Sequence, residues 1–586
     1  GEANTALGRG ALLANTTASN NTAVGRSALT ANTTGANNVA VGSTALDANT
    51  TGASNNAIGY GALGANTTAN DNTAIGHVAL TLNTTGAQNT AIGKGALSAN
   101  TTASNNTGVG YHALDQNTTG AGNTAIGAQA LDSNTTAANN TAVGKSALGA
   151  NTTGNSNTAV GTNALDSNTT ASNNTAVGDN ALGSNTTGSE NTAIGRSSMA
   201  DNTTGNQNTA IGRVALLSNT TGTANTAVGA FALDANTTAD SSTGIGYGAL
   251  SANTTGSSNT ACGHSSLNAN TDGVFNTAFG KDALLINTSG SYNSAFGTFA
   301  MDASTGNYNT AIGYGSLSAT TSASNNTAVG YLALLTNSSG GTNTAVGTSA
   351  LQNNTTASNN VAVGNGALLL NTTGANNTAL GTNALDNNTT ASSNTAVGFV
   401  ALGANTTGAG NVGVGKDALL ANTTGNHNTA VGVDCLTSNT TGEKNTAVGK
   451  TALDACTTGG NNAAVGRDAL GDVTTGDLNV GLSTAGQHIT TGDNNICIGY
   501  NAGSSASPSG EITTGSNNIC LGNNDINNLF CADTSISASD SRDKTDVASF
   551  NIGLAWVEAL RPVTYKWDRR TWYGTDENPY GTPDGS

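Results

Sequence analysis

The chain has 586 residues, of which 17 are Lys or Arg and 34 are Asp or Glu, so its formal net charge is −17. Charged residues make up only 9% of the chain and aromatic residues 4%, whereas ordinary soluble domains carry about 25% charged residues. This acidic balance disfavours a nucleic-acid partner, because duplex binders need a basic patch. No apolar run reaches the roughly 18–20 residues of a membrane span, so we expect no membrane insertion. The chain opens inside a repeat, and we expect it to be a fragment of a longer protein.

A repeat of 17 residues runs through most of the chain. The phrase Asn-Thr-Ala-Val/Ile-Gly first starts at Asn4 and recurs every 17 residues as far as Asn293. One residue is lost before Asn309, and the step of 17 residues then resumes to Asn479, which gives 29 units in all. Two irregular copies start at Asn495 and Asn518. Self-similarity at a short fixed period is typical of a solenoid.

Each unit is numbered here from its leading Asn, position one. The unit from Asn21 to Asn37 reads N-T-A-V-G-R-S-A-L-T-A-N-T-T-G-A-N. Its first residues predict a short strand, Gly25 predicts a bend, and the run 32–35 predicts a turn in which Asn and Gly adopt left-handed backbone. Because 17 residues are too few for a paired-helix repeat or a propeller blade, we predict one rung of a parallel β-solenoid, an all-β fold.

Stacked rungs place identical residues in columns, and Asn columns can hydrogen-bond from rung to rung. The ladder residues of the first rungs are Asn21, Gly25, Asn32, Asn38, Gly42 and Asn49.

A single rung buries too little apolar surface to offset the entropy of ordering its backbone. We therefore expect neighbouring rungs and neighbouring chains to supply the missing stability. In the strand, Thr22 and Val24 face one way and Ala23 the other. With Val24 inside the solenoid, Ala23 would face outward, where another backbone could approach. The sequence thus predicts an obligate homo-oligomer.

This pattern resembles the head repeats of trimeric autotransporter adhesins of the YadA type, over roughly residues 4–525. The resemblance implies a trimer of left-handed parallel β-rolls, and hence an elongated homotrimer. The unit found here is longer than the usual head repeat, and similar repeats occur in bacteriophage tail fibres and tailspikes.

The composition changes after the repeats. We divide the chain into a regular shaft (1–483), irregular terminal rungs (484–525), a linker (526–538) and a terminal segment (539–586). In this last segment the apolar spacing from Ile552 to Leu560 predicts a short helix, and the alternation from Val563 to Trp567 predicts a strand. We therefore expect a small α+β segment at the C-terminus.

The start of that segment carries Ser-Asp-Ser-Arg-Asp-Lys from Ser539 to Lys544, followed by Leu560-Arg561-Pro562-Val563 and Tyr565-Lys566-Trp567. It resembles the endosialidase-type intramolecular chaperone of phage tailspikes and tail fibres. The resemblance implies that the chaperone assists assembly of a trimeric fibre and then cuts itself off at Ala538–Ser539, with Ser539 as nucleophile and Lys544 as its base. Asp540 and Arg542 are supporting motif residues. Only 47 residues follow Ser539, fewer than family members have, so we expect the chaperone to be truncated.

Position six is the most variable column, and it holds aromatic and cationic residues at a corner exposed to solvent. Its tyrosines are candidates for stacking on sugar rings, with a merely solubilising corner as the alternative: Tyr60, Tyr111, Tyr247, Tyr314 and Tyr331.

The remaining polar residues point to no metal or cofactor. The five histidines are scattered, the six cysteines lack metal-ligand spacing, and of the position-ten aspartates only Asp115 and Asp132 lie in adjacent rungs. Packing explains the cysteines, with a disulfide among Cys497, Cys520 and Cys531 as the alternative. Position twelve forms a column of Asn-Thr-Thr glycosylation sequons, which turn chemistry explains equally well.

We interpret the chain as a structural fibre protein of a phage tail, located in the virion, that gives reach and adhesion to a host cell surface. Its expected partners are further copies of itself, phage tail or baseplate proteins bound through a missing N-terminus, and a host surface glycan or protein. The alternative is a cell-surface trimeric adhesin or an extracellular, possibly glycosylated, fibril. We expect no enzyme activity apart from single-turnover self-cleavage.

Overall fold

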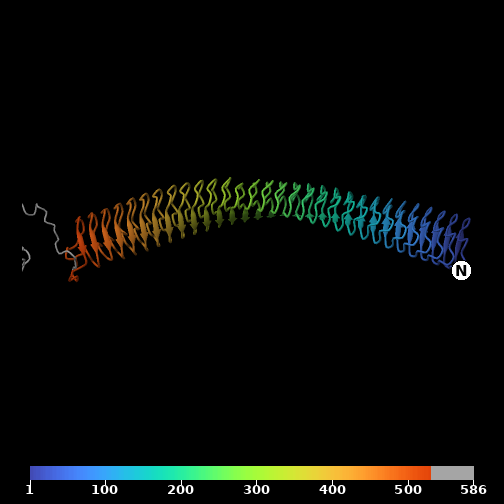
Figure 1. Ribbon diagram of the computed structural model, residues 1–586, viewed down its shortest axis with the longest axis horizontal. Helices are drawn as coiled ribbons and strands as arrows, with labels where there is room; N and C mark the ends of the chain where they lie inside the picture. The colour runs from blue at the N-terminus through green and yellow to red at the C-terminus, as the bar shows by residue number, and fades with distance from the viewer. Residues whose placement is uncertain (529–586) are drawn as a thin grey trace, which may run out of the picture. The chain divides into compact units, whose positions relative to one another are not determined.

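The computed structural model describes residues 1–528, and these residues form a parallel β-solenoid (Figure 1). A sheet of 31 strands runs along one side of the stack, and each strand has three residues. The strands are β1 (Thr5–Leu7), β2 (Thr22–Val24), β3 (Val39–Val41), β4 (Asn56–Ile58), β5 (Thr73–Ile75), β6 (Thr90–Ile92), β7 (Thr107–Val109), β8 (Thr124–Ile126), β9 (Thr141–Val143), β10 (Thr158–Val160), β11 (Thr175–Val177), β12 (Thr192–Ile194), β13 (Thr209–Ile211), β14 (Thr226–Val228), β15 (Thr243–Ile245), β16 (Thr260–Cys262), β17 (Thr277–Phe279), β18 (Ser294–Phe296), β19 (Thr310–Ile312), β20 (Thr327–Val329), β21 (Thr344–Val346), β22 (Val361–Val363), β23 (Thr378–Leu380), β24 (Thr395–Val397), β25 (Val412–Val414), β26 (Thr429–Val431), β27 (Thr446–Val448), β28 (Ala463–Val465), β29 (Val480–Leu482), β30 (Ile496–Ile498) and β31 (Ile519–Leu521).

Every strand pairs in parallel with the strand of the next rung, and the pairing keeps the repeat in register. Thr22 pairs with Val39, Ala23 with Ala40, and Val24 with Val41. The predicted solenoid fold is therefore confirmed. Among the described residues no helix is long and apolar enough to cross a membrane.

The close stacking of rungs explains the glycine at position five. Gly25 has a φ of 132°, and a Cβ atom there would lie 2.5 Å from the carbonyl oxygen of Gly42 in the next rung. A side chain at this bend would therefore push the rungs apart.

Left-handed backbone occurs at other positions than the sequence predicts. Ser27, Leu29 and Asn37 have φ values of 56°, 50° and 62°, whereas Asn32 and Gly35 do not have positive φ. L-residues adopt this conformation at a cost of about 1–2 kcal/mol each. Backbone hydrogen bonds between rungs hold them there, such as the 3.0 Å bond from the Leu29 N–H to the Ala45 carbonyl.

The interior of the solenoid is lined by alanine and leucine. Ala23, Ala28 and Leu29 have no exposed surface, while Thr22 and Val24 lie half-buried on the outer face of the sheet. The prediction that Val24 faces the interior and Ala23 faces outward is therefore wrong.

The narrowness of the coil explains this orientation. Gly108 stands at position three of its rung, and a Cβ atom there would lie 3.4 Å from Leu97 Cδ1 and 3.1 Å from the Ala113 carbonyl oxygen. Alanine fills this space against the leucine of the preceding rung. A branched side chain would overlap with the leucine, so the valine column must point outward.

The chain divides into two compact units, Gly1–Asp525 and 526–586. The first unit is a long, gently bowed stack of rungs (Figure 1). It includes the irregular terminal rungs, where β30 and β31 remain paired in register. The predicted helix at 552–560 and the predicted strand at 563–567 lie outside the described residues.

Candidate functional site

Two asparagine ladders run through the solenoid and meet at one carbonyl group in each rung. At position one, the Asn38 N–H donates to Asn21 Oδ1 at 2.9 Å, and Asn38 Nδ2 donates to the Gly52 carbonyl at 2.9 Å. At position twelve, Asn49 Nδ2 donates at 2.9 Å both to Asn32 Oδ1 in the preceding rung and to the same Gly52 carbonyl. The ladders thus satisfy buried polar groups of the turn and link each rung to the next.

The same geometry bears on the glycosylation sequons of position twelve. Asn32 and Asn49 have no exposed surface, and the Asn49 amide nitrogen uses its hydrogens inside the rung. A glycan on this nitrogen would replace one of its hydrogens and so remove one of these two hydrogen bonds. The folded solenoid therefore has no room for a glycan at these asparagines.

The position-twelve ladder is interrupted twice, and the interruptions leave buried polar atoms without partners. Ser304 and Thr320 replace Asn in two successive rungs, and their hydroxyl groups and Asn287 Oδ1 lack hydrogen bonds. Cys456 replaces Asn in a later rung, and Asn439 Oδ1 in the rung before it also lacks a partner. Buried acceptors without partners cost about 1–3 kcal/mol each, so these rungs are local weak points.

The tyrosines predicted to contact glycans all lie on the surface and are 49–56% exposed: Tyr60, Tyr111, Tyr247, Tyr314 and Tyr331. They do not form one continuous stripe. Tyr60 stacks on His77, Tyr247 stacks on His264, and Tyr314 stacks on Tyr331 with ring centroids 5.7 Å apart. Paired aromatic rings at an exposed corner can stack on a sugar ring, and this role stays a prediction.

A second group of aromatic residues was missed by the sequence analysis because it lies at other positions of the unit. Phe275, Tyr292 and Tyr308 occupy position seventeen of successive rungs and stack with centroid distances of 5.1 Å. Phe279 and Phe296 occupy position four, and their rings stack at 5.3 Å with an interplanar angle of 5°. All five side chains are at least 40% exposed. Reading each column of the repeat for its largest side chain would have found them.

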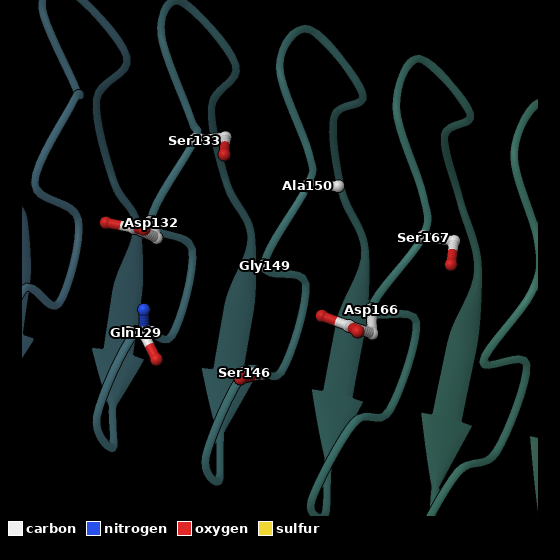
Figure 2. A pocket seen from close by; sticks show the side chains of 8 residues that line it. All are labelled: Gln129, Asp132, Ser133, Ser146, Gly149, Ala150, Asp166 and Ser167. Carbon is white, nitrogen blue, oxygen red and sulfur yellow. The ribbon is translucent and has the colours of Figure 1, made fainter.

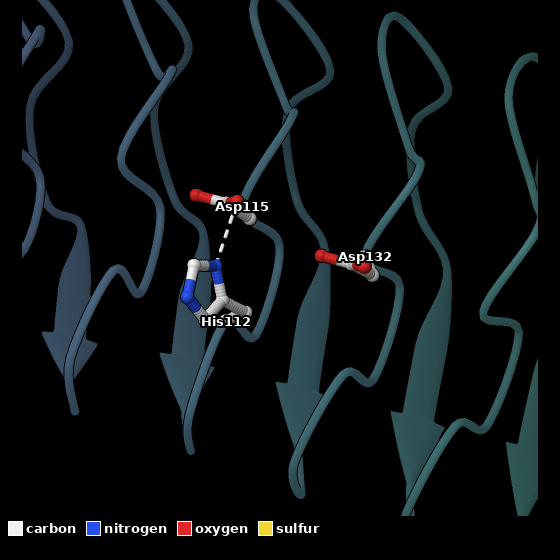
Figure 3. A group of neighbouring side chains, drawn as sticks. All are labelled: His112, Asp115 and Asp132. Carbon is white, nitrogen blue, oxygen red and sulfur yellow. Dashed lines mark hydrogen bonds and ion pairs between the residues drawn. The ribbon is translucent and has the colours of Figure 1, made fainter.

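One cluster of residues that can bind metals lies on the turn side of the described rungs (Figure 3). His112 Nδ1 lies 2.8 Å from Asp115 Oδ2, and Asp132 of the next rung completes a group whose ligand atoms lie within 4.8 Å of one another. Burial raises the pKa of the Asp132 carboxyl, and the nearby Asp115 charge raises it further, while His112 lowers it. Asp115 also accepts a hydrogen bond from Ser98. Because both Asp115 oxygens already have partners, hydrogen bonding alone accounts for the cluster.

A shallow groove of about 400 Å³ lies beside this cluster (Figure 2). Asp132 and Asp166 line it, and Gly149 stands between them where a third acid would otherwise be. The two carboxylates are two rungs apart, about 10 Å at the usual strand spacing. This separation lies beyond the range of about 5–9.5 Å over which paired carboxylates act in glycoside hydrolysis.

The cysteines of the solenoid are packing residues in the described part of the chain. Cys435, Cys456 and Cys497 are buried free thiols, and burial raises the pKa of each to about 12. Cys262, at position four, is also a free cysteine, but its side chain is partly exposed. Cys531, the remaining member of the proposed disulfide set, lies outside the described residues.

The candidate self-cleavage residues Ser539, Asp540, Arg542 and Lys544 also lie outside the described residues, so the structure does not bring them to any site. A comparison with known families covers the segment in which they lie. The family model described as chaperone of endosialidase, a peptidase family, matches residues 539–582. The match begins at Ser539. No curated protein matches the chain.

Proposed function

We propose that the chain is the shaft and terminal part of a phage tail fibre, assembled as a homotrimer with the help of its C-terminal chaperone and carried in the virion. The observation behind this proposal is the order of the two parts: a solenoid of 31 strands is followed directly by the match to the endosialidase chaperone. A chain with this order joins an elongated rod to an assembly factor that is used once. The rod supplies reach, and its exposed tyrosines are the proposed contacts to a host surface glycan.

The proposed self-cleavage follows from the chemistry of the motif. Ser539 Oγ attacks the carbonyl carbon of Ala538, and Lys544 takes the hydroxyl proton. The bond from Ala538 to the Ser539 nitrogen breaks, the nitrogen leaves as an amine after it receives a proton, and an ester links Ala538 to Ser539 Oγ. Water then hydrolyses the ester. The products are a solenoid that ends at Ala538 and a released chaperone segment.

Native mass spectrometry of the purified protein tests assembly and cleavage together. Three chains, each ending at Ala538, are the expected result, and Ser539→Ala should give three full chains of 57.1 kDa each. A cleaved Ser539→Ala variant would refute the role of Ser539, and a monomer would refute the trimer.

Adhesion needs a separate assay, because assembly alone does not show binding. The purified fibre should retain binding to cells of its host after Thr162→Ala, and it should lose binding after Tyr314→Ala with Tyr331→Ala, which removes the stacked tyrosine pair. Equal binding by both variants would refute the tyrosine contact.

A further inference from the structure

The outer face of the sheet is a long uncharged strip. Its two columns are position two and position four of the strands β1–β31, and the side chains of position three point the other way. Position four is apolar in all 31 strands, and position two is Thr in 22 of them. The nine isoleucines of position four are each 37–43% exposed. The strip, called here the outer strip, is therefore an uncharged, largely apolar surface that no residue of 1–528 covers.

The outer strip is large enough for a stable protein interface. Thirty steps of about 4.8 Å give a length of about 145 Å, and three extended residues give a width of about 10 Å. The resulting area of about 1,400 Å² exceeds the roughly 800 Å² that each partner buries in a standard interface.

The charges of the chain favour this strip as the place where copies meet. Neither outward column carries a charged residue in any of the 31 strands, although the chain has a net charge of −17. The acidic residues stand on other columns, such as Asp132 and Asp166 at position ten. Two acidic copies repel each other through those columns, so the uncharged strip is the face through which they can approach.

The repeat spacing indicates what kind of partner fits. A partner that fills the strip along its whole length must present side chains at the same spacing over 31 rungs. A further copy of this chain meets that condition by construction, and facing sheets interdigitate their side chains about 10 Å apart.

The residues of the outer strip also vary along its length. Phe279 and Phe296, the aromatic residues of position four, stand in two adjacent rungs. Near the C-terminal end, Val480, Ile496 and Ile519 replace Thr at position two and widen the apolar surface. Parallel copies in register bring these like features together, whereas a shift by one rung places a phenylalanine against Cys262 or Ile312.

We propose that the outer strip packs against the outer strips of further copies of this chain, parallel and in rung-to-rung register, with the Phe279–Phe296 pair fixing the register. This inference rests on the proposed function, because both require that copies of the chain associate. It adds the surface through which they do so. It replaces the outward alanine column as the place of contact between chains.

Paired charge substitutions in the full chain test the surface. Val160→Lys with Val228→Lys places two lysines on the strip, and Thr162→Lys with Ala230→Lys places two lysines at position six of the same two rungs. Sedimentation velocity should show several associated chains for the wild type and the position-six variant, and a single chain for the strip variant. Because Val160 and Val228 are already part-exposed in the single chain, the strip variant should keep its strand content by circular dichroism.

The outcomes separate the surface from the rest of the proposed function. An assembled strip variant would overturn the surface while leaving the fibre intact. A monomeric wild type would overturn both. An assembled wild type that fails to bind host cells would leave the surface standing and remove adhesion.

Cys262 gives a second test that needs no substitution within the solenoid. It lies at position four on the strip, and the other cysteines of the described residues are buried. In a Cys531→Ser background, a bis-maleimide with a span of about 10 Å, the distance between packed sheets, should link Cys262 of one copy to Cys262 of another. Assembled protein without this cross-link would refute the parallel register.

Discussion

Removing one rung of the position-twelve ladder should destabilise the solenoid by an amount that depends on the rung chosen. Asn151 Nδ2 donates to Asn134 Oδ1 and to the Gly154 carbonyl, each at 3.0 Å, and Asn151 Oδ1 accepts from Asn168 Nδ2 at 2.9 Å. Asn151→Ala removes all three hydrogen bonds and leaves Asn134 Oδ1 buried without a partner. At about 0.5–1.5 kcal/mol for each bond and about 1–3 kcal/mol for an unpaired buried acceptor, we expect a loss of about 5 kcal/mol.

Asn439 provides a matched control at the end of the same ladder. Its Nδ2 donates to Asn422 Oδ1 at 2.7 Å and to the Gly442 carbonyl at 3.1 Å, but its Oδ1 has no partner because Cys456 follows. Asn439→Ala removes two hydrogen bonds and shifts the unpaired acceptor from Asn439 to Asn422. The number of unpaired acceptors does not change, so this variant should be about 2–4 kcal/mol less destabilising than Asn151→Ala.

Hydrogen exchange measures the two losses locally, which suits a repeat protein whose rungs do not unfold as a single unit. The backbone N–H groups of Thr152 and Thr440 occupy the same position of their rungs and donate to Thr169 and Thr457 at 2.9 and 2.8 Å. Their free energies of opening should fall by different amounts in the two variants. Equal losses would refute the idea that the unpaired acceptor sets the difference.

Three further predictions follow from the repeat. Gly59→Ala should destabilise its rung by about 2–4 kcal/mol, because the new Cβ would lie 2.2 Å from the Gly76 carbonyl oxygen, whereas Gly64→Ala in the same rung meets its nearest atom at 3.4 Å and should leave the melting temperature nearly unchanged. Ser304→Asn with Thr320→Asn should slow local hydrogen exchange, since the pair restores the ladder beyond Asn287, and faster exchange would count against it. Burial raises the pKa of the Asp166 carboxyl above 3.8, so its ionisation opposes folding above that pH. Asp166→Asn should therefore raise the melting temperature at pH 7, and this gain should disappear as the pH falls below about 4, where the native carboxyl is also protonated; a gain that persists at pH 3 would show another cause.

The repeat alone was sufficient to predict the rung, because a strict spacing of 17 residues leaves few ways to stack. The alternation of Thr22, Ala23 and Val24 predicts that Thr22 and Val24 share one face of the strand and that Ala23 lies on the other. It does not predict which of the two faces is interior. Hydrophobicity favours Val24 inside, and only the width of the coil, set by Leu29 against the strand, reverses this choice.

The surface features were harder to predict because they depend on contacts between rungs. The position-six tyrosines could be found as a column, but their stacking partners depend on which residue stands one rung away, as with Tyr60 and His77. His112 and Asp115 belong to two different columns of the repeat. Examining one column at a time therefore does not show that their side chains meet. The candidate self-cleavage residues were proposed from their motif, and the family match at 539–582 spans their positions.

The direction of the hydrogen bonds has a mechanical consequence. Bonds between parallel strands lie across the strands, so in this solenoid they point along the stack. A pull on the two ends of the solenoid then loads every interface between rungs in series, and each interface carries the full force. The weakest interface sets the tensile strength. The break in the asparagine ladder between Asn287 and Asn337 spans three successive interfaces that lack this bond. It also holds three of the four buried side-chain atoms without a partner among the described residues, so under tension the solenoid should part there first, near its middle.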